Sequence, residues 1–257
     1  MKKFLQKWSI AFKIVPVVIL VVSLKYIFHS LGWEQLSLNP LFTSLVAGTI
    51  FLLGFLISGV LADYKESEKL PSEMASCFDI MYDESSAKDT KESKEFRNYL
   101  AELLKDIDEW FYEKQKTPEI LQKISHMNTY FANMEKSFGS AVDRMKNEQN
   151  SLRRSIIRIS TIRDTFFVAS AYAIAEALTF FLICGLILVK VEPFFEAAFF
   201  ASLVTFLVNY MLLLIVDLDN PFDYKKNGES GTEISLRPLN KVYERMTRQL
   251  PLSQYQK

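Results

Sequence analysis

A run of 22 residues between Leu41 and Ala62 carries no charged side chain and ends abruptly in the polar segment 63–69. An apolar helix of this length matches the hydrocarbon core of a bilayer, which is about 30 Å thick. Three further apolar stretches of spanning length lie at about 10–28, 166–189 and 194–216. The sequence therefore predicts an all-α membrane protein with four transmembrane helices, which excludes most classes of soluble enzyme.

The spans form two pairs separated by a charged middle. This order predicts an N-terminal transmembrane hairpin (1–62), a cytoplasmic helical domain (63–164), a C-terminal transmembrane hairpin (165–216) and a cytoplasmic tail (217–257). Two charges fall inside the first span, and we expect both to extend their ammonium groups to the headgroups. They are Lys13 and Lys25.

Basic residues near the spans predict the orientation, because cytoplasmic loops carry an excess of Lys and Arg. The flanking basic residues are Lys2, Lys3, Lys7, Arg153, Arg154, Arg158, Arg163, Lys225, Lys226 and Arg237. The loop 29–40 carries none, and the short hairpin at 190–193 carries only Lys190. We therefore expect an integral protein of the plasma membrane with both termini in the cytoplasm.

Composition narrows the function classes further. The chain has 30 basic and 30 acidic residues, so nothing in its charge points to nucleic acid. Cys77 is predicted on the cytoplasmic side and Cys184 inside the membrane, so neither suits a disulfide. No phosphate-binding loop, dinucleotide motif or metal-ligand spacing is present, so we expect no enzyme, no cofactor and no metal site.

The charged middle reads as helical, with Ser72 a candidate N-cap and a helix over about 91–114. Pro118 marks the start of the next helix. Apolar residues then recur every three or four positions from Ile120 to Ile159, which predicts one helix from 118 to about 163, roughly 70 Å long. Two partners for this stripe stay open: the 91–114 helix of the same subunit, or a neighbouring subunit.

Four arginines lie close before the third span: Arg153, Arg154, Arg158 and Arg163. One interpretation is attraction to anionic headgroups. The other is an electropositive vestibule that concentrates anions at a pore entrance.

The second span has one face that could line a pore. A single helical stripe holds Ser44, Ala47, Phe51, Phe55, Ser58 and Ala62. Its ends carry small or hydroxyl-bearing residues and its middle carries two phenyl rings. The stripe fits simple helix–helix packing. If several copies surround an axis, it also fits a pore in which the rings form a constriction that gates by dewetting.

Two motifs resemble those of the bestrophin channels. The segment Phe51-Leu52-Leu53-Gly54-Phe55, followed by Leu70-Pro71, is similar to the family's neck helix, where a Phe-x-Leu-Gly-Phe segment lines the narrowest part of a pentameric pore. The tail motif of Asn220, Pro221 and Phe222 resembles the Asn-Pro-Phe after the family's last membrane helix. The order of spans also matches. The resemblance implies a bestrophin-like fold, a homopentamer and passage of chloride or other small anions, as in bestrophin-like proteins of the bacterial inner membrane.

The chain departs from the family pattern at several places. Ala62-Asp63-Tyr64 stands where members usually carry Arg-Trp, and Ala47 replaces a bulky aliphatic residue at the outermost neck position. The tail segment 223–229 lacks the acidic run that helps bind calcium in animal members. Because calcium prefers six to eight oxygen ligands, we expect no activation by calcium.

Two polar side chains lie inside the second hairpin. Glu176 is the only charge of the third span, and Asn209 lies within the fourth. The spacing puts Glu176 on the face of Ala169 and Ala173, which predicts that it points into protein. Its role stays open between a protonated or hydrogen-bonded tie, with Asn209 as a partner, and an ion or proton site.

These observations favour a homo-oligomeric ion channel whose partners are other copies of itself, the lipid bilayer and small inorganic ions. The alternative is a non-conducting, membrane-anchored scaffold or signalling protein that acts through its long cytoplasmic helix.

Overall fold

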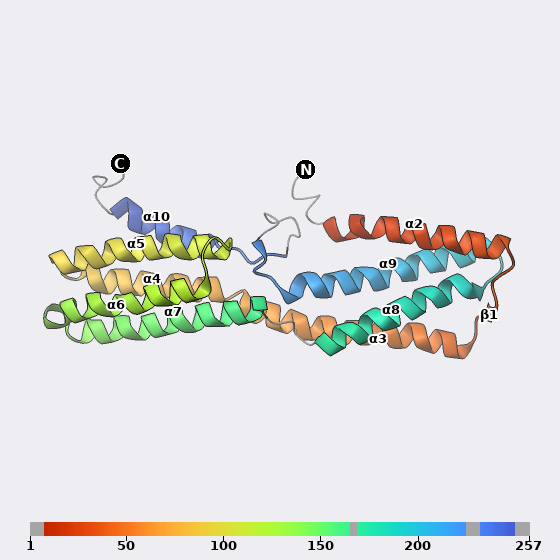
Figure 1. Ribbon diagram of the computed structural model, residues 1–257, viewed down its shortest axis with the longest axis horizontal. Coiled ribbons are helices and arrows are strands. Elements are labelled where there is room, and N and C mark those ends of the chain that lie inside the picture. Colours follow the sequence, from red (N-terminus) through yellow and green to blue (C-terminus); the bar gives the residue numbers. More distant parts are fainter. Residues whose placement is uncertain (1–7, 165–168, 225–231, 250–257) are drawn as a thin grey trace. The chain divides into compact units, whose positions relative to one another are not determined.

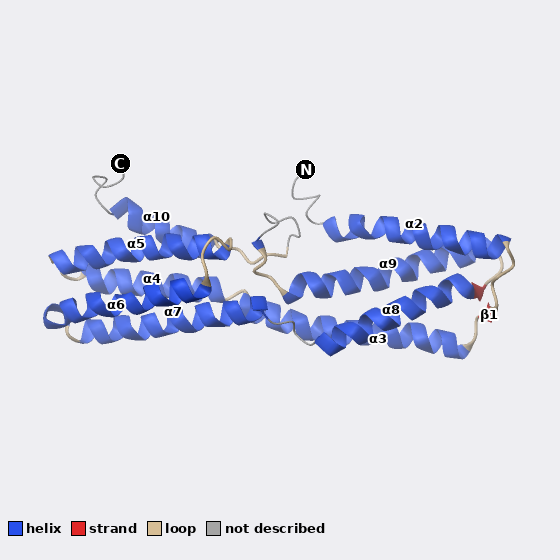
Figure 2. Ribbon diagram, viewed as in Figure 1, coloured by secondary structure: helices blue, strands red, loops and turns tan. Residues whose placement is uncertain are grey.

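The computed structural model describes residues 8–164, 169–224 and 232–249. They are mainly helical, as predicted, with one short parallel pairing of β1 (Leu36–Ser37) with β2 (Val189–Lys190) (Figure 2). The chain divides into two compact units. The membrane unit holds 1–64, 166–221 and 228–232, and the second unit holds 65–165, 222–227 and 233–257.

Among the described residues, four helices are long and apolar enough to cross a membrane, which confirms the predicted spans. They are α2 (Ser9–Ser30), α3 (Pro40–Ser67), α8 (Ala169–Leu188) and α9 (Phe194–Asp219), labelled in Figure 1. The protein is thus an integral membrane protein. The predicted start of the third span at 166 lies outside the described residues, as do the basic residues Lys2, Lys3, Lys7, Lys225 and Lys226.

The membrane unit is held together by apolar contacts among α3, α8 and α9. Their core includes Leu53, Val60, Leu182, Val208 and Ile215. Each of these side chains is almost fully buried, and close packing of such side chains stabilises contacts between membrane helices. α2 packs on α9 and α8. The core therefore uses one face of α3 and leaves the opposite face uncovered.

A buried polar network joins the ends of α2 and α8. The Lys25 side chain is fully buried, and its Nζ donates to Glu34 Oε1 at 2.7 Å and to the Val189 carbonyl at 2.6 Å. The other carboxylate oxygen of Glu34 lies 2.8 Å from His29 Nδ1. The expectation that Lys25 extends to the headgroups is therefore wrong, because an acidic partner from the following loop satisfies it inside the protein.

The second unit consists of α4 (Leu70–Ser86), α5 (Lys91–Phe111), α6 (Thr117–Phe138), α7 (Ser140–Asp164) and α10 (Arg237–Gln249). The predicted helix over 91–114 is confirmed as α5, whose first turn is closed by reciprocal hydrogen bonds between Thr90 and Ser93. Pro118 lies in the first turn of α6, as predicted. Ser72 is not an N-cap, because α4 begins at Leu70.

The single helix predicted from 118 to 163 is wrong. Gly139 has φ +50° and ψ −121°, so the chain turns there and α7 packs back against α6 (Figure 1). The apolar stripe is buried within this hairpin and against neighbouring α4 and α5. Its one polar member, Gln149, donates to the Ile124 carbonyl at 2.6 Å. The stripe is thus buried inside the protomer, which leaves little of its apolar surface for a neighbouring subunit.

The C-terminal helix α10 is fixed to α4 by one arginine. Arg245 Nη1 lies 2.5 Å from Asp79 Oδ1, and its other terminal nitrogen pairs with Asp83. The two acidic residues are four positions apart and therefore share a face of α4. One guanidinium group has enough N–H donors to pair with both carboxylates at once.

Candidate functional site

The stripe proposed to line a pore lies on the uncovered face of α3. All six predicted residues are exposed in the protomer: Ser44, Ala47, Phe51, Phe55, Ser58 and Ala62. The two phenyl rings are 77% and 69% exposed. They are exposed because Leu53, Leu56 and Val60 take the opposite side of the same turns into the core.

Other spans expose a different kind of surface. Large apolar side chains dominate there: Phe12, Ile19 and Leu20 on α2, Ile174, Phe180 and Phe181 on α8, and Phe195, Phe199, Phe200 and Leu203 on α9. Such surfaces suit lipid tails. Along α3, by contrast, the two phenyl rings stand among exposed small residues, including Gly48 and Gly54. The α3 face therefore carries more small residues around its two rings, and Leu41 and Leu61 near its ends are exposed as well.

Gly185 allows α3 and α8 to approach closely. A Cβ atom at this position would lie 2.6 Å from Phe42 Cε2, well inside contact distance. At Gly48, on the exposed face, an added Cβ would meet nothing within 4 Å. The two glycines therefore differ: the first serves packing inside the protomer, while the second keeps an outer face small.

The arginines before the third span do not form one cluster of free charges. Arg153 donates to Ser125 Oγ at 3.0 Å, and Arg154 donates to Ser151 Oγ at 2.9 Å. Arg158 lies 3.6 Å from Glu66 Oε1. These three lie on α7 and remain partly or fully exposed.

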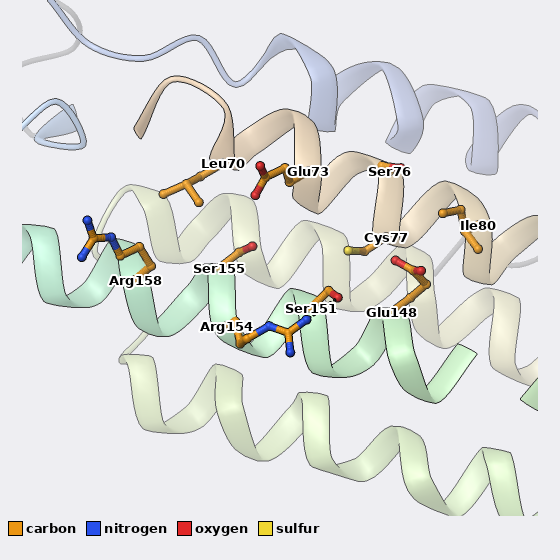
Figure 3. Close-up of a pocket in the computed structure, with 10 residues that line it drawn as sticks. All are labelled: Leu70, Glu73, Ser76, Cys77, Ile80, Glu148, Ser151, Arg154, Ser155 and Arg158. Atoms are coloured by element: carbon orange, nitrogen blue, oxygen red, sulfur yellow. Dashed lines mark hydrogen bonds between the residues drawn. The ribbon is translucent and has the colours of Figure 1, made fainter. Parts of the chain in front are cut away.

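Arg154 and Arg158 line a groove of about 560 Å³ between α4 and α7 (Figure 3). Glu73 and Glu148 line the same groove, so its charges balance. The Cys77 thiol beneath it is buried, and burial, together with Glu148, raises its pKa to about 12. A thiol in this state is an inert structural side chain at neutral pH.

Arg163 has a different role from its neighbours. Its Nη2 donates to the Phe111 carbonyl at 2.9 Å and its Nη1 to the Trp110 carbonyl at 3.3 Å. Its guanidinium lies 4.5 Å from the centre of the Trp110 ring. It therefore binds the last carbonyl groups of α5, which lack partners within the helix. We grouped Arg163 with the exposed basic residues and so did not predict this role. The sequence does show the aromatic pair Trp110 and Phe111 at the end of α5.

The tail motif lies where α9 ends. Asn220 follows the last residue of the helix, and Pro221 and Phe222 are buried. In the second unit, the Phe222 ring packs 6.1 Å from Phe111, and Tyr224 meets Phe111 edge-on at 5.8 Å. The Phe222 carbonyl also lies 3.5 Å from Arg163 Nη2. The motif thus contributes to an aromatic cluster at the end of α5.

Glu176 and Asn209 do not form the predicted tie. Glu176 is exposed on α8, as is Ala173, while the side chain of Ala169 lies outside the described part of the chain. The Asn209 amide donates to the Thr205 carbonyl of its own helix at 2.8 Å. Within the protomer, the other side of α8 supplies the core residues Ala175 and Leu182, so the prediction that Glu176 points into protein stays a prediction.

Over the described residues, no group of three or more His, Cys, Asp or Glu comes together to hold a metal ion.

Comparison with known proteins gives the fold. No protein-family model and no curated protein matches the sequence. Solved structures do match: a variant of a bacterial bestrophin homolog from Klebsiella pneumoniae has a TM-score of 0.76 at 14% identity, over 94% of this chain and 99% of that one. A second variant of that homolog has a TM-score of 0.76 at 13% identity, over 92% and 98%. A crystal structure described as a membrane protein has a TM-score of 0.77 at 12% identity, over 93% and 100%. The bestrophin-like fold inferred from the two sequence motifs is therefore confirmed.

Proposed function

We propose that this protein is a homopentameric ion channel and that α3 of each copy lines its pore. The supporting observation is the exposed face of α3, which carries Phe51 and Phe55 among small and hydroxyl-bearing residues. Five copies around one axis would bring the phenyl rings together to form a circular constriction. Exclusion of water by such rings is a known way to close a narrow passage.

We further propose that the channel passes chloride or other small anions. The support is the likeness in fold to bacterial bestrophin homologs, together with the neck and tail motifs. Exposed Arg154 and Arg158 in the second unit add positive charge, although Glu73 and Glu148 offset it within their groove. Selectivity is read from the reversal potential across a chloride gradient, which lies near the chloride equilibrium potential if anions carry the current.

Reconstitution into bilayers tests the pore assignment. Replacing Phe51 and Phe55 together by alanine removes the constriction, so resting conductance should rise. The matched control replaces Phe199 and Phe200, two rings of similar exposure on α9, and should leave conductance unchanged. Equal effects of the two double variants, or unchanged conductance in both, would contradict the assignment of α3 to the pore.

Stoichiometry and calcium response have separate readouts. The intact assembly in detergent should have the mass of five 29.7-kDa chains. Currents should not respond to calcium, because the tail after Phe222 lacks an acidic run that could supply enough oxygen ligands. Steep activation at micromolar calcium would refute this expectation.

The main argument for the scaffold alternative does not hold. It depended on a long free helix with an apolar stripe, and that stripe is buried in the α6–α7 hairpin. A scaffold would also remain electrically silent in the reconstitution experiment, with or without the phenyl rings.

A further inference from the structure

The membrane unit holds two opposite charges that form no ion pair among the described residues. Apart from Glu196 in the first turn of α9, the charges inside the apolar spans are Lys13, Lys25 and Glu176. Lys25 is buried and paired with Glu34. Lys13 and Glu176 are both exposed, and neither forms an ion pair within the described residues. A charge facing hydrocarbon is costly, so side chains of this kind face protein or water and pair with one another.

The two charges lie at similar distances along their helices from the end where α2 and α8 meet. The bond from Lys25 Nζ to the Val189 carbonyl sets the C-terminal ends of α2 and α8 side by side, and the parallel pairing of β1 with β2 continues that alignment. Lys13 precedes Lys25 by 12 residues and Glu176 precedes Val189 by 13. At 1.5 Å per residue, these separations are about 18 Å and about 20 Å.

Both side chains point away from the contact between α2 and α8. A helix turns by 100° per residue, so Lys13 points about 120° away from Lys25 on α2. Glu176 is exposed on α8. Ile14 and Ile10 take the buried face of α2, and Ala175 takes that of α8. The protomer therefore presents the two charges outward from two different helices.

We propose that Lys13 on α2 of one copy pairs with Glu176 on α8 of the next copy. Rotation about an axis along the membrane normal leaves depth unchanged, so cyclic assembly keeps the two charges level in every copy. Small residues beside Glu176, Ala173 and Ala177, are exposed and leave room for a neighbouring helix. Each interface then receives one positive and one negative charge, and no copy retains an unmatched one.

This inference rests on the proposed homo-oligomer, and co-assembly of charge-reversed chains tests it. Lys13→Glu alone places two carboxylates at every interface, and Glu176→Lys alone places two ammonium groups there. Each variant should lose at least about tenfold in association constant, since close charge pairs at interfaces couple by 1.5 kcal/mol or more. Co-expressed with different tags, the two variants should assemble with each other, because contacts between unlike chains restore opposite charges at up to four of the five interfaces of a mixed pentamer.

Controls separate this result from misfolding and from a pair within one chain. Glu196→Lys reverses an exposed charge in the first turn of α9 and should leave assembly unchanged. Helix content by circular dichroism should be the same in all variants. A pair within one chain would be restored only by Lys13→Glu and Glu176→Lys in the same chain. Assembly that the double variant restores and that mixing the two single variants does not restore would overturn the proposal.

The remaining outcomes are also distinct. If the wild-type chain is oligomeric and neither reversal changes its mass distribution, the ion pair is refuted while the channel proposal stands. If the wild-type chain is itself monomeric, the proposed oligomer fails and the ion pair fails with it.

Discussion

Replacing Arg163 by alanine should destabilise the second unit strongly, although the residue lies among arginines that tolerate change. The guanidinium makes a 2.9 Å hydrogen bond to the Phe111 carbonyl and a weaker one to the Trp110 carbonyl, and it covers the Trp110 ring. Removing it takes this donor from the Phe111 carbonyl and opens a gap beside buried aromatic rings, while the Trp110 carbonyl keeps the 3.0 Å hydrogen bond from the Glu113 backbone N–H.

The magnitude follows from these contacts. A hydrogen bond to a charged donor contributes about 1.5–3 kcal/mol, and a partly desolvated cation–π contact about 0.5–2 kcal/mol. Desolvation offsets part of this gain, and burial indeed lowers the pKa of Arg163. The expected loss in free energy of unfolding is about 2–4 kcal/mol, which corresponds to a fall in melting temperature of about 5–15 °C for a chain of this size.

Thermal unfolding of the purified protein in detergent, followed by circular dichroism, measures this loss. Arg154→Ala is the matched control, because Arg154 is exposed and its one hydrogen bond is to Ser151 on its own helix. That variant should change stability by no more than about 0.5 kcal/mol. Arg163→Lys should be intermediate, since it keeps the charge and loses the planar fork. Similar melting temperatures for Arg163→Ala and Arg154→Ala would refute this account of Arg163.

Two further predictions concern a turn and a buried acid. Gly139→Ala should cost about 1–3 kcal/mol, because φ is +50° there, and Ser140→Ala should be nearly neutral in the same thermal assay. Burial raises the pKa of Glu34, but hydrogen bonds and charges of Lys25 and His29 outweigh burial and hold it below its ordinary 4.5. Its contribution to stability should therefore be complete above pH 4.5 and be lost as pH falls through the lowered value. Glu34→Gln should abolish this part of the acid dependence, and an unchanged melting-temperature profile would contradict it.

Much of the architecture could be predicted from the sequence, because hydrophobic length and periodicity are local properties. The four spans followed from long apolar runs, and α5 followed from apolar residues on one face. The turn at Gly139 could not be found in this way. The apolar spacing continues almost unbroken from α6 into α7, so the pattern fits one long helix as well as two helices that fold together. A lone glycine between two such segments is only a weak signal for a turn.

The individual roles of charged side chains also required the tertiary structure. Lys25 and Lys13 look alike in the sequence, as two lysines near the ends of one span, yet the first is buried on Glu34 and the second is exposed. The same holds for Arg163 and Arg154 on α7. In each pair, a partner from a distant segment determines which side chain is buried. The residue type alone does not reveal that partner.

The sequence by itself determined that this protein spans a membrane four times and has further helices between the second and third spans. Polar backbone groups and charges are costly in hydrocarbon, and this cost applies to each segment independently of the others. The tertiary structure decided which face of each helix is used inside the protomer. It turned the apolar stripe of the second unit inward and left Phe51, Phe55, Lys13 and Glu176 outward. Those choices depend on how helices far apart in the chain fill one another's surfaces, and packing of that kind is fixed only when all of them are in place.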